Sequence, residues 1–158
     1  MKKTVIFLMI FTTALPLPSQ MAQPSRLQIL NQIEKIKITE YKSLPFSEER
    51  LKEYLELRVE HPKIVFKQAV LESGRFSSAS FVYGNNLFGM KKPIVRKTKA
   101  IGTYLRHAKY KHWTDSVDDY ALWQQYYKSK GYKLNNYYKF LGRIYAEDKN
   151  YIKKLKCI

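Results

Sequence analysis

The chain has 158 residues, of which 45% are hydrophobic and 15% aromatic, and its formal net charge is +16. The length suits one domain with its own core, and the composition excludes a disordered chain. The only cysteine, Cys157, excludes an internal disulfide. The large positive charge favours a polyanion or an anionic surface as a partner.

The first residues have the pattern of a secretory signal. Lys2 and Lys3 form a positive segment, and residues 4–15 form an apolar run that prolines and polar residues then end. That run is shorter than the roughly 20 apolar residues of a membrane-spanning helix; an uncleaved N-terminal anchor is the alternative. We therefore expect residues 1–22 to be a signal peptide that exports the protein to the periplasm, the cell envelope or the outside. Anionic wall polymer or a membrane surface then fits the charge better than nucleic acid.

Residues 23–43 are predicted to form a lead-in helix. Leu27, Leu30, Ile33 and Ile36 recur at near-helical spacing with polar residues between them. We expect this amphipathic helix to pack loosely on one compact domain, residues 44–158. No repeat or low-complexity segment is present.

Two helices are predicted next. Ser47 is a good N-cap for the first, and acidic Glu48 and Glu49 suit the positive end of its dipole. Pro62 is placed to begin the second, because its missing N–H would be unpaired there in any case. Gly74 is expected to end it after Ser73.

Glu72 lies on the apolar face of that second helix. It follows Val65 and Ala69 at the i, i+4 and i+7 spacing of one helix face. A carboxylate on such a face is costly unless it is paired, hydrated or used. A catalytic carboxyl and a salt-bridged core glutamate are both consistent with this spacing.

The stretch from Ser73 to Thr114 contains no aspartate or glutamate, whereas residues 91–111 contain eight lysines and arginines. Within it, residues 93–95 and 101–105 are predicted to pair as a small β-hairpin. A solvated basic loop is the alternative.

Three further helices complete the predicted domain. Ser116 and Asp119 form a cap-like pair at the start of a helix that ends near Gly131. Asn135 or Asn136 can cap the next helix. The last short helix is expected to be capped by Asp148 and to bury Tyr151, Ile152 and Leu155.

Few other groups could carry chemistry. The three histidines lack metal-ligand spacing, Cys157 lacks an activating setting, and neither a nucleophile elbow nor a phosphate loop occurs. We expect neither a metal nor a cofactor. Glycosidic cleavage needs a carboxyl group that a poorly solvated site keeps protonated, and Glu72 is placed for that role.

Four blocks of the sequence resemble the peptidoglycan glucosaminidases of glycoside hydrolase family 73, of the flagellar and autolysin types. The blocks occur in the family's order, at residues 68–76, 85–91, 113–120 and 145–151. The resemblance implies a mainly α, lysozyme-like domain with a small basic lobe flanking a groove. It also implies hydrolysis of the β-1,4 bond that follows N-acetylglucosamine in the glycan strands of peptidoglycan.

The resemblance also implies roles for single residues. Glu72 matches the catalytic acid, and Tyr145 matches a tyrosine near the reacting sugar. The expected substrate-binding positions are Tyr83, Asn85, Asn86, Phe88, Gly89 and Tyr120. Among these, Tyr120 is expected to serve packing more than catalysis.

The chain departs from the family in one respect. Many members carry a second carboxylate between the asparagine-rich and aspartate-tyrosine blocks, and this interval has none. Asp115, Asp118 and Asp119 follow it and are interpreted as cap and helix-dipole residues. The substrate's own N-acetyl group is then the expected nucleophile. The alternatives are a lysozyme or lytic transglycosylase that cuts after N-acetylmuramic acid, and a catalytically silent peptidoglycan-binding module.

Overall fold

The computed structural model describes residues 23–158, so the predicted signal peptide lies outside the described residues. The described chain is mainly helical and contains one two-stranded antiparallel sheet, which confirms the predicted mainly-α class. The elements are α1 (Arg26–Tyr41), α2 (Glu48–Arg58), α3 (Pro62–Glu72), α4 (Ala79–Val82), β1 (Gly102–Tyr104), β2 (His107–Lys109), α5 (Trp113–Ser129), α6 (Tyr137–Ile144) and α7 (Tyr151–Lys156).

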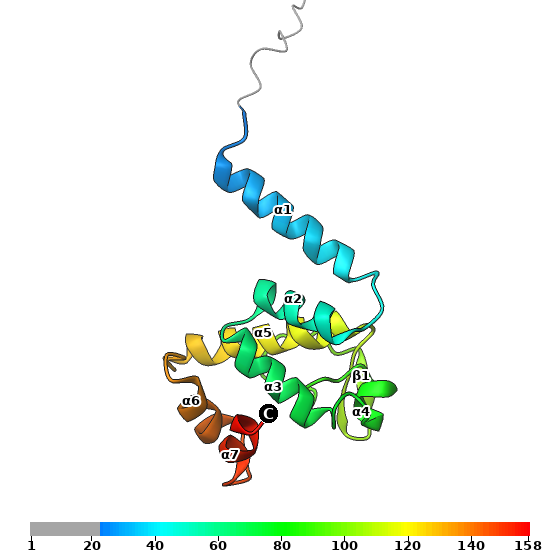
Figure 1. Ribbon diagram of the computed structural model, residues 1–158, viewed down its shortest axis with the longest axis vertical. Coiled ribbons are helices and arrows are strands. Elements are labelled where there is room, and N and C mark those ends of the chain that lie inside the picture. The colour runs from blue at the N-terminus through cyan, green and yellow to red at the C-terminus, as the bar shows by residue number, and fades with distance from the viewer. Residues whose placement is uncertain (1–22) are drawn as a thin grey trace, which may run out of the picture.

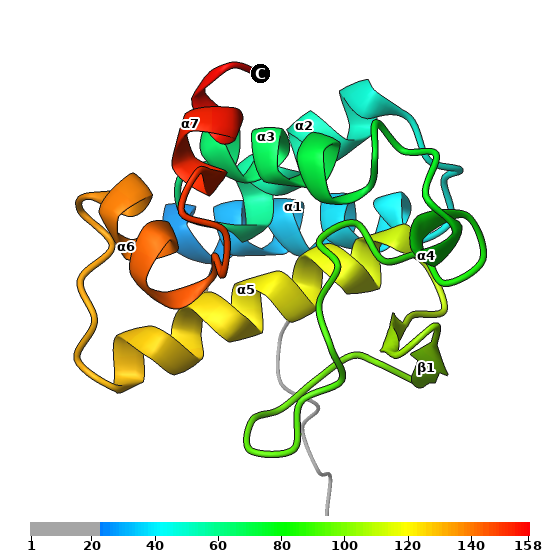
Figure 2. The ribbon, with the colours of Figure 1, turned by 90° about the horizontal axis from the view of Figure 1, so that it is seen from below.

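Helix α5 is the centre of the domain. Helix α2 packs against α3 and α5, and α7 packs against α3 and α6. Figure 2 shows α6 and α7 towards the C-terminal end of α5, and α4 with the hairpin near its N-terminal end. The core between these elements is aromatic and aliphatic, with Tyr54, Ala69, Trp113, Val117 and Leu141 among its buried residues. The candidate active site lies between the connection from α6 to α7 and the segment that leads into the hairpin.

Helix α1 stands away from this body (Figure 1), and none of its residues is buried. Leu27, Leu30 and Ile36 are each more than half exposed. Only its C-terminal end meets the domain, where the Tyr41 ring packs 5.4 Å from that of Tyr54. Helix α1 lies within the span predicted for the lead-in helix, and its contacts with the domain are confined to that end. Within residues 23–158, no helix is both long and apolar enough to cross a bilayer.

The predicted starts of α2 and α3 are confirmed. The Ser47 hydroxyl accepts a hydrogen bond from the Arg50 N–H, 3.2 Å away, and Pro62 is the first residue of α3. Helix α3 ends at Glu72, and Gly74 follows in the left-handed region with φ +58°. The chain therefore turns sharply just after the carboxylate.

The predicted start of α5 is wrong by several residues. The N-cap is His112, whose side chain accepts from the Thr114 N–H, while Asp115 closes the capping box. The Ser116 hydroxyl instead accepts from the Leu87 N–H at 3.1 Å. Ser116 therefore lies inside the helix, and His112 caps it.

The last helices follow the prediction with one change. The Asn136 side chain caps α6, and Gly131 ends the turn after α5 with φ +85°. Helix α7 has no side-chain cap, because Asp148 accepts from the Asn150 N–H one turn before the helix begins. Tyr151 and Leu155 are buried as expected.

The hairpin is real, but its predicted pairing is wrong. Strand β1 pairs with β2, with Thr103 opposite Ala108, and residues 93–95 form no strand. The Ala108 N–H also donates to the Met90 carbonyl, which ties the hairpin to the preceding segment. Residues 91–101 are therefore a long basic loop beside the hairpin.

Candidate active site

A cleft of about 640 Å³ opens between the two sides of the domain. Its walls come from the end of α3, residues 88–96, the second half of α5, and the connection from α6 to α7. Glu72 lies in it together with Phe88, Gly89 and Tyr145. The structure thus brings together four of the eight site residues predicted from the sequence.

Glu72 is a cleft acid whose pKa is raised. Burial raises the pKa of its carboxyl group, and a hydrogen bond from the Tyr151 hydroxyl opposes that rise without cancelling it. No ion pair to Glu72 occurs within residues 23–158, so the salt-bridged core glutamate is excluded for the described chain. A carboxyl group that keeps its proton to higher pH suits proton donation.

Gly89 allows the opposite wall to approach this carboxyl. Its φ of +62° lies in the left-handed region, and a Cβ there would lie 3.3 Å from the Glu72 Oε2. The neighbouring Phe88 carbonyl accepts a hydrogen bond from the Tyr145 hydroxyl, which joins the two sides of the cleft. Phe88 and Tyr145 therefore help to fix the geometry around Glu72.

Asn86 holds the turn that carries Phe88 and Gly89. Its amide nitrogen donates to the carbonyls of Met90 and Ala108 at 2.9 and 2.7 Å. Its amide oxygen accepts the N–H groups of Phe88 and Met90, both at 3.2 Å. Because the side chain is buried and fully bonded, Asn86 shapes this wall of the cleft from behind and has no surface that faces it.

Three further predicted binding residues lie away from the cleft. The Asn85 amide donates to the carbonyls of Tyr110 and Lys111 and supports the hairpin. Tyr83 is 64% exposed and packs against Tyr104 of strand β1, and it is not among the residues that line the cleft. Tyr120 is fully buried, as its expected packing role implies, so it offers no surface to a sugar.

Tyr120 instead belongs to a buried chain of polar groups that reaches the site. Its hydroxyl donates to the Gln68 amide oxygen at 2.5 Å and lies 2.6 Å from the Tyr137 hydroxyl. The Gln68 amide nitrogen donates to the Tyr151 hydroxyl at 3.1 Å. Because that oxygen accepts from Gln68, its hydrogen is free to point to Glu72.

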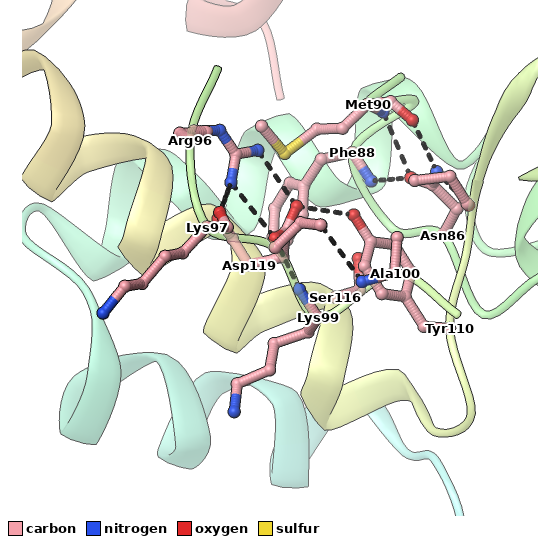
Figure 3. A network of polar contacts seen from close by, with 12 residues as sticks. Asn86, Phe88, Met90, Arg96, Lys97, Lys99, Ala100, Tyr110, Ser116 and Asp119 are labelled. Carbon is pink, nitrogen blue, oxygen red and sulfur yellow. Dashed lines mark hydrogen bonds and ion pairs between the residues drawn. The ribbon is translucent and has the colours of Figure 1, made fainter. Parts of the chain in front are cut away.

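The basic loop is anchored by a buried ion pair (Figure 3). The Arg96 guanidinium meets both carboxylate oxygens of Asp119, at 3.1 and 3.0 Å, and the side chains are 6% and 0% exposed. The Lys99 N–H and the Tyr110 hydroxyl also donate to this carboxylate, each at 2.9 Å. Burial alone would raise the pKa of Asp119, but hydrogen bonds from Arg96 and Thr98 and the guanidinium charge outweigh it and lower that pKa.

This pair corrects the interpretation of the acidic helix start. Asp115 does cap α5, but Asp119 fastens the basic loop, and Asp118 pairs with Arg58 at 2.7 Å and accepts from the Tyr54 hydroxyl. The first role depends on local sequence. The other two depend on residues more than 20 positions away, which spacing along one helix cannot reveal.

Several residues that line the cleft were not predicted as site residues from the sequence. Trp123, Tyr126 and Tyr127 present aromatic surface from α5, and aromatic faces suit the apolar faces of sugar rings. Their i, i+3 and i+4 spacing marks one helix face, but it resembles ordinary core spacing. Glu147 also lines the cleft, next to the predicted Tyr145.

No group of three or more histidine, cysteine or acidic side chains that could hold a metal ion occurs in the part of the chain that the structure describes. The carboxyl groups of Glu72, Glu147 and Asp148 and the phenol groups of several tyrosines line the cleft. Together with an open cleft lined by aromatic rings, that set suits acid-assisted cleavage of a glycan.

Comparison with known proteins gives the same class of activity. Residues 49–158 match the model of the Glucosaminidase family, described as mannosyl-glycoprotein endo-beta-N-acetylglucosaminidase. No curated protein and no solved structure matches the chain. The matched span includes α3, the basic loop, the hairpin and the whole cleft. The chain belongs to the Glucosaminidase family, and it is a glycoside hydrolase of the endo-β-N-acetylglucosaminidase type with a lysozyme-like, mainly α domain.

Proposed function

We propose that the protein hydrolyses the β-1,4 bond that follows N-acetylglucosamine in peptidoglycan, with Glu72 as the general acid. One observation carries this proposal: the Glu72 carboxyl lies in a cleft of about 640 Å³, and burial raises its pKa. A glycosidic oxygen must gain a proton as it leaves, and a carboxyl group with a raised pKa supplies that proton near neutral pH.

The remaining cleft residues support binding of a glycan strand. Tyr145 and Phe88 hold the wall opposite Glu72 through their hydrogen bond, and Trp123 and Tyr126 offer rings along α5. Lys91 and Lys92 line the far wall. Their positive charges favour a substrate that carries carboxylates, as the peptide-bearing strands of peptidoglycan do.

The test is a digest of purified sacculi followed by identification of the new reducing ends. We expect N-acetylglucosamine at those ends, and a loss of roughly 10²- to 10⁴-fold in rate for Glu72→Gln, the usual contribution of a general acid. Glu56→Gln is the matched control, because Glu56 is an exposed carboxylate on α2 away from the cleft. Unchanged activity in Glu72→Gln would overturn the proposal.

The same digest separates the alternatives. N-acetylmuramic acid at the new reducing ends would identify a lysozyme, and 1,6-anhydro ends would identify a lytic transglycosylase. Retention on sacculi without release of fragments would identify a silent binding module. Each of these results would replace the proposed bond specificity.

We also propose that the protein acts in the cell envelope after export, with anionic wall polymer or a membrane surface as a secondary partner. The support is the signal-like pattern of residues 1–22 and the net charge of +16. Fractionation followed by mass spectrometry of the mature N-terminus tests export. An intact N-terminus in the cytoplasmic fraction would contradict it.

A further inference from the structure

The small lobe offers the cleft no carboxylate. No acidic residue occurs between Ser73 and Thr114, and this interval contains the basic loop and the hairpin. The next three acids are also committed elsewhere: Asp115 caps α5, and Asp118 and Asp119 are buried in ion pairs. A carboxylate that assists Glu72 must therefore come from the other side of the cleft.

That side provides two carboxylates. Asp148 lines the cleft, but it forms an ion pair with Lys154 at 2.8 Å and accepts the Asn150 N–H. Glu147 lines the cleft too, and its side chain has no hydrogen-bond or ion-pair partner within residues 23–158. Glu147 is therefore the cleft carboxylate that remains free to meet a bound molecule.

The chain places Glu147 near the reacting centre. It lies in the short connection between Tyr145 and Tyr151, and both of these tyrosines lie close enough to Glu72 for its charge to raise their pKa values. Two residues span at most about 7 Å, so the Glu147 backbone lies within roughly that distance of Tyr145. The role of base requires room for a water molecule between the two carboxyl groups, which are roughly 6.5–9.5 Å apart in inverting glycosidases.

We propose that Glu147 is the general base of the reaction and activates the attacking water; the proposal rests on the proposed function. The water oxygen bonds to the anomeric carbon as the bond from that carbon to the glycosidic oxygen breaks. Glu147 takes the proton that the water loses, and Glu72 gives its proton to the leaving oxygen. One water molecule is consumed and the configuration at the anomeric carbon inverts.

The charges around the cleft suit these two roles. Glu147 is exposed and lines the same cleft as Lys91 and Lys92. Burial favours the protonated form of Glu72. Two carboxyl groups in different environments can then divide the acid and base roles at one pH.

Product stereochemistry tests the assignment. The full-length chain is incubated with a soluble peptidoglycan fragment, and the anomer released first is read by proton NMR before it equilibrates. We expect the α-anomer from a β-linked substrate. A β-anomer would overturn the proposal, because it indicates retention, the outcome when the N-acetyl group is the nucleophile.

Variants of Glu147 complete the test. We expect Glu147→Gln to lower kcat by roughly 10²- to 10⁴-fold without loss of thermal stability, since the side chain is exposed. Azide added to Glu147→Ala should restore turnover and release an α-glycosyl azide, which a structural role would not explain. Glu56→Gln serves again as the control.

The outcomes separate this inference from the proposed function. If Glu72→Gln is inactive while Glu147→Gln keeps activity within threefold of the wild type, only the role of Glu147 fails. If Glu72→Gln remains active, the proposed function itself fails. Azide rescue together with inversion supports both assignments.

Discussion

Glu72 lines the cleft and Asp119 is buried beneath the basic loop, and the environments of these two carboxylates shift their pKa values in opposite directions. Glu72 has a phenol hydroxyl as its polar partner, and burial raises its pKa. Asp119 is more deeply buried, yet Arg96, Thr98 and Lys99 lower its pKa. Burial alone therefore does not decide the protonation state; the charge and the donors beside the carboxylate do.

The two parts of the site therefore differ: Glu72 has no salt bridge, whereas the basic loop is held by the Arg96–Asp119 ion pair. At the end of α3, an acid without a salt bridge faces open space, so it is available for proton transfer. At the basic loop, Asp119 accepts hydrogen bonds from Arg96 and Lys99 and so holds residues 91–101 against α5. The following predictions change one side at a time.

The largest expected effect is the loss of the anchor at Asp119. Asp119→Asn leaves the buried guanidinium of Arg96 without its countercharge, and breaking one partner of a buried pair costs about 3–5 kcal/mol. Thermal unfolding at neutral pH measures the loss. The difference from the wild type should shrink at acid pH, because the stability from a lowered pKa is lost as pH falls through the folded-state value.

Asp148→Asn is the control for this measurement. Its ion pair with Lys154 is exposed, with side chains 44% and 60% accessible, and such exposed pairs contribute little to stability. Equal destabilisation of the two variants would show that the Asp119 pair does not anchor the loop.

The next effect concerns the close approach of Gly89 to Glu72. Gly89→Ala puts a methyl group 3.3 Å from the Glu72 Oε2 and forces a non-glycine residue to φ +62°. We expect activity on sacculi to fall roughly 10- to 100-fold, because small displacements of a reacting group are costly. Gly102→Ala, where a Cβ meets nothing within 4 Å, should leave activity unchanged.

A smaller effect is expected at Tyr151. Tyr151→Phe removes the hydrogen bond that opposes the raised pKa of Glu72, so that pKa should rise further. The alkaline limb of the activity profile should move to higher pH, since a general acid works while it is protonated. The Gln68 amide also loses its acceptor, which destabilises the fold by about 1–3 kcal/mol. An unmoved alkaline limb would mean that Glu72 does not set it.

The smallest effect is a gain in stability. Glu72→Gln should raise the free energy of unfolding at pH 7 by about 0.5–2 kcal/mol, as substitutions that relax functional strain often do. An acid with a raised folded-state pKa contributes stability below its unfolded pKa and loses it as pH rises. The gain should therefore disappear below the ordinary glutamate pKa of 4.5, which unfolding curves at several pH values measure. No gain at pH 7 would contradict the effect of burial on Glu72.

Local sequence signals predicted much of the fold. Ser47, Pro62, Gly74 and Asn136 act within one helical turn of their own position, and each lies where its helix begins or ends. The i, i+4 and i+7 pattern ending at Glu72 likewise depends on one helix alone. The order of four short blocks then indicated the family, although it did not indicate which block residues touch the cleft.

What the sequence by itself determined is a mainly α chain with an acid on an apolar helix face, because caps and periodicity act over a few residues. Only the tertiary structure decided how the acids divide their roles. Asp119 meets Arg96 across 23 positions, Gly89 meets Glu72 across 17, and Glu147 comes into the same cleft from the far end of the chain. The pKa of a carboxyl group depends on such neighbours in space, so the raised pKa of Glu72 and the lowered pKa of Asp119 arise only in the folded chain.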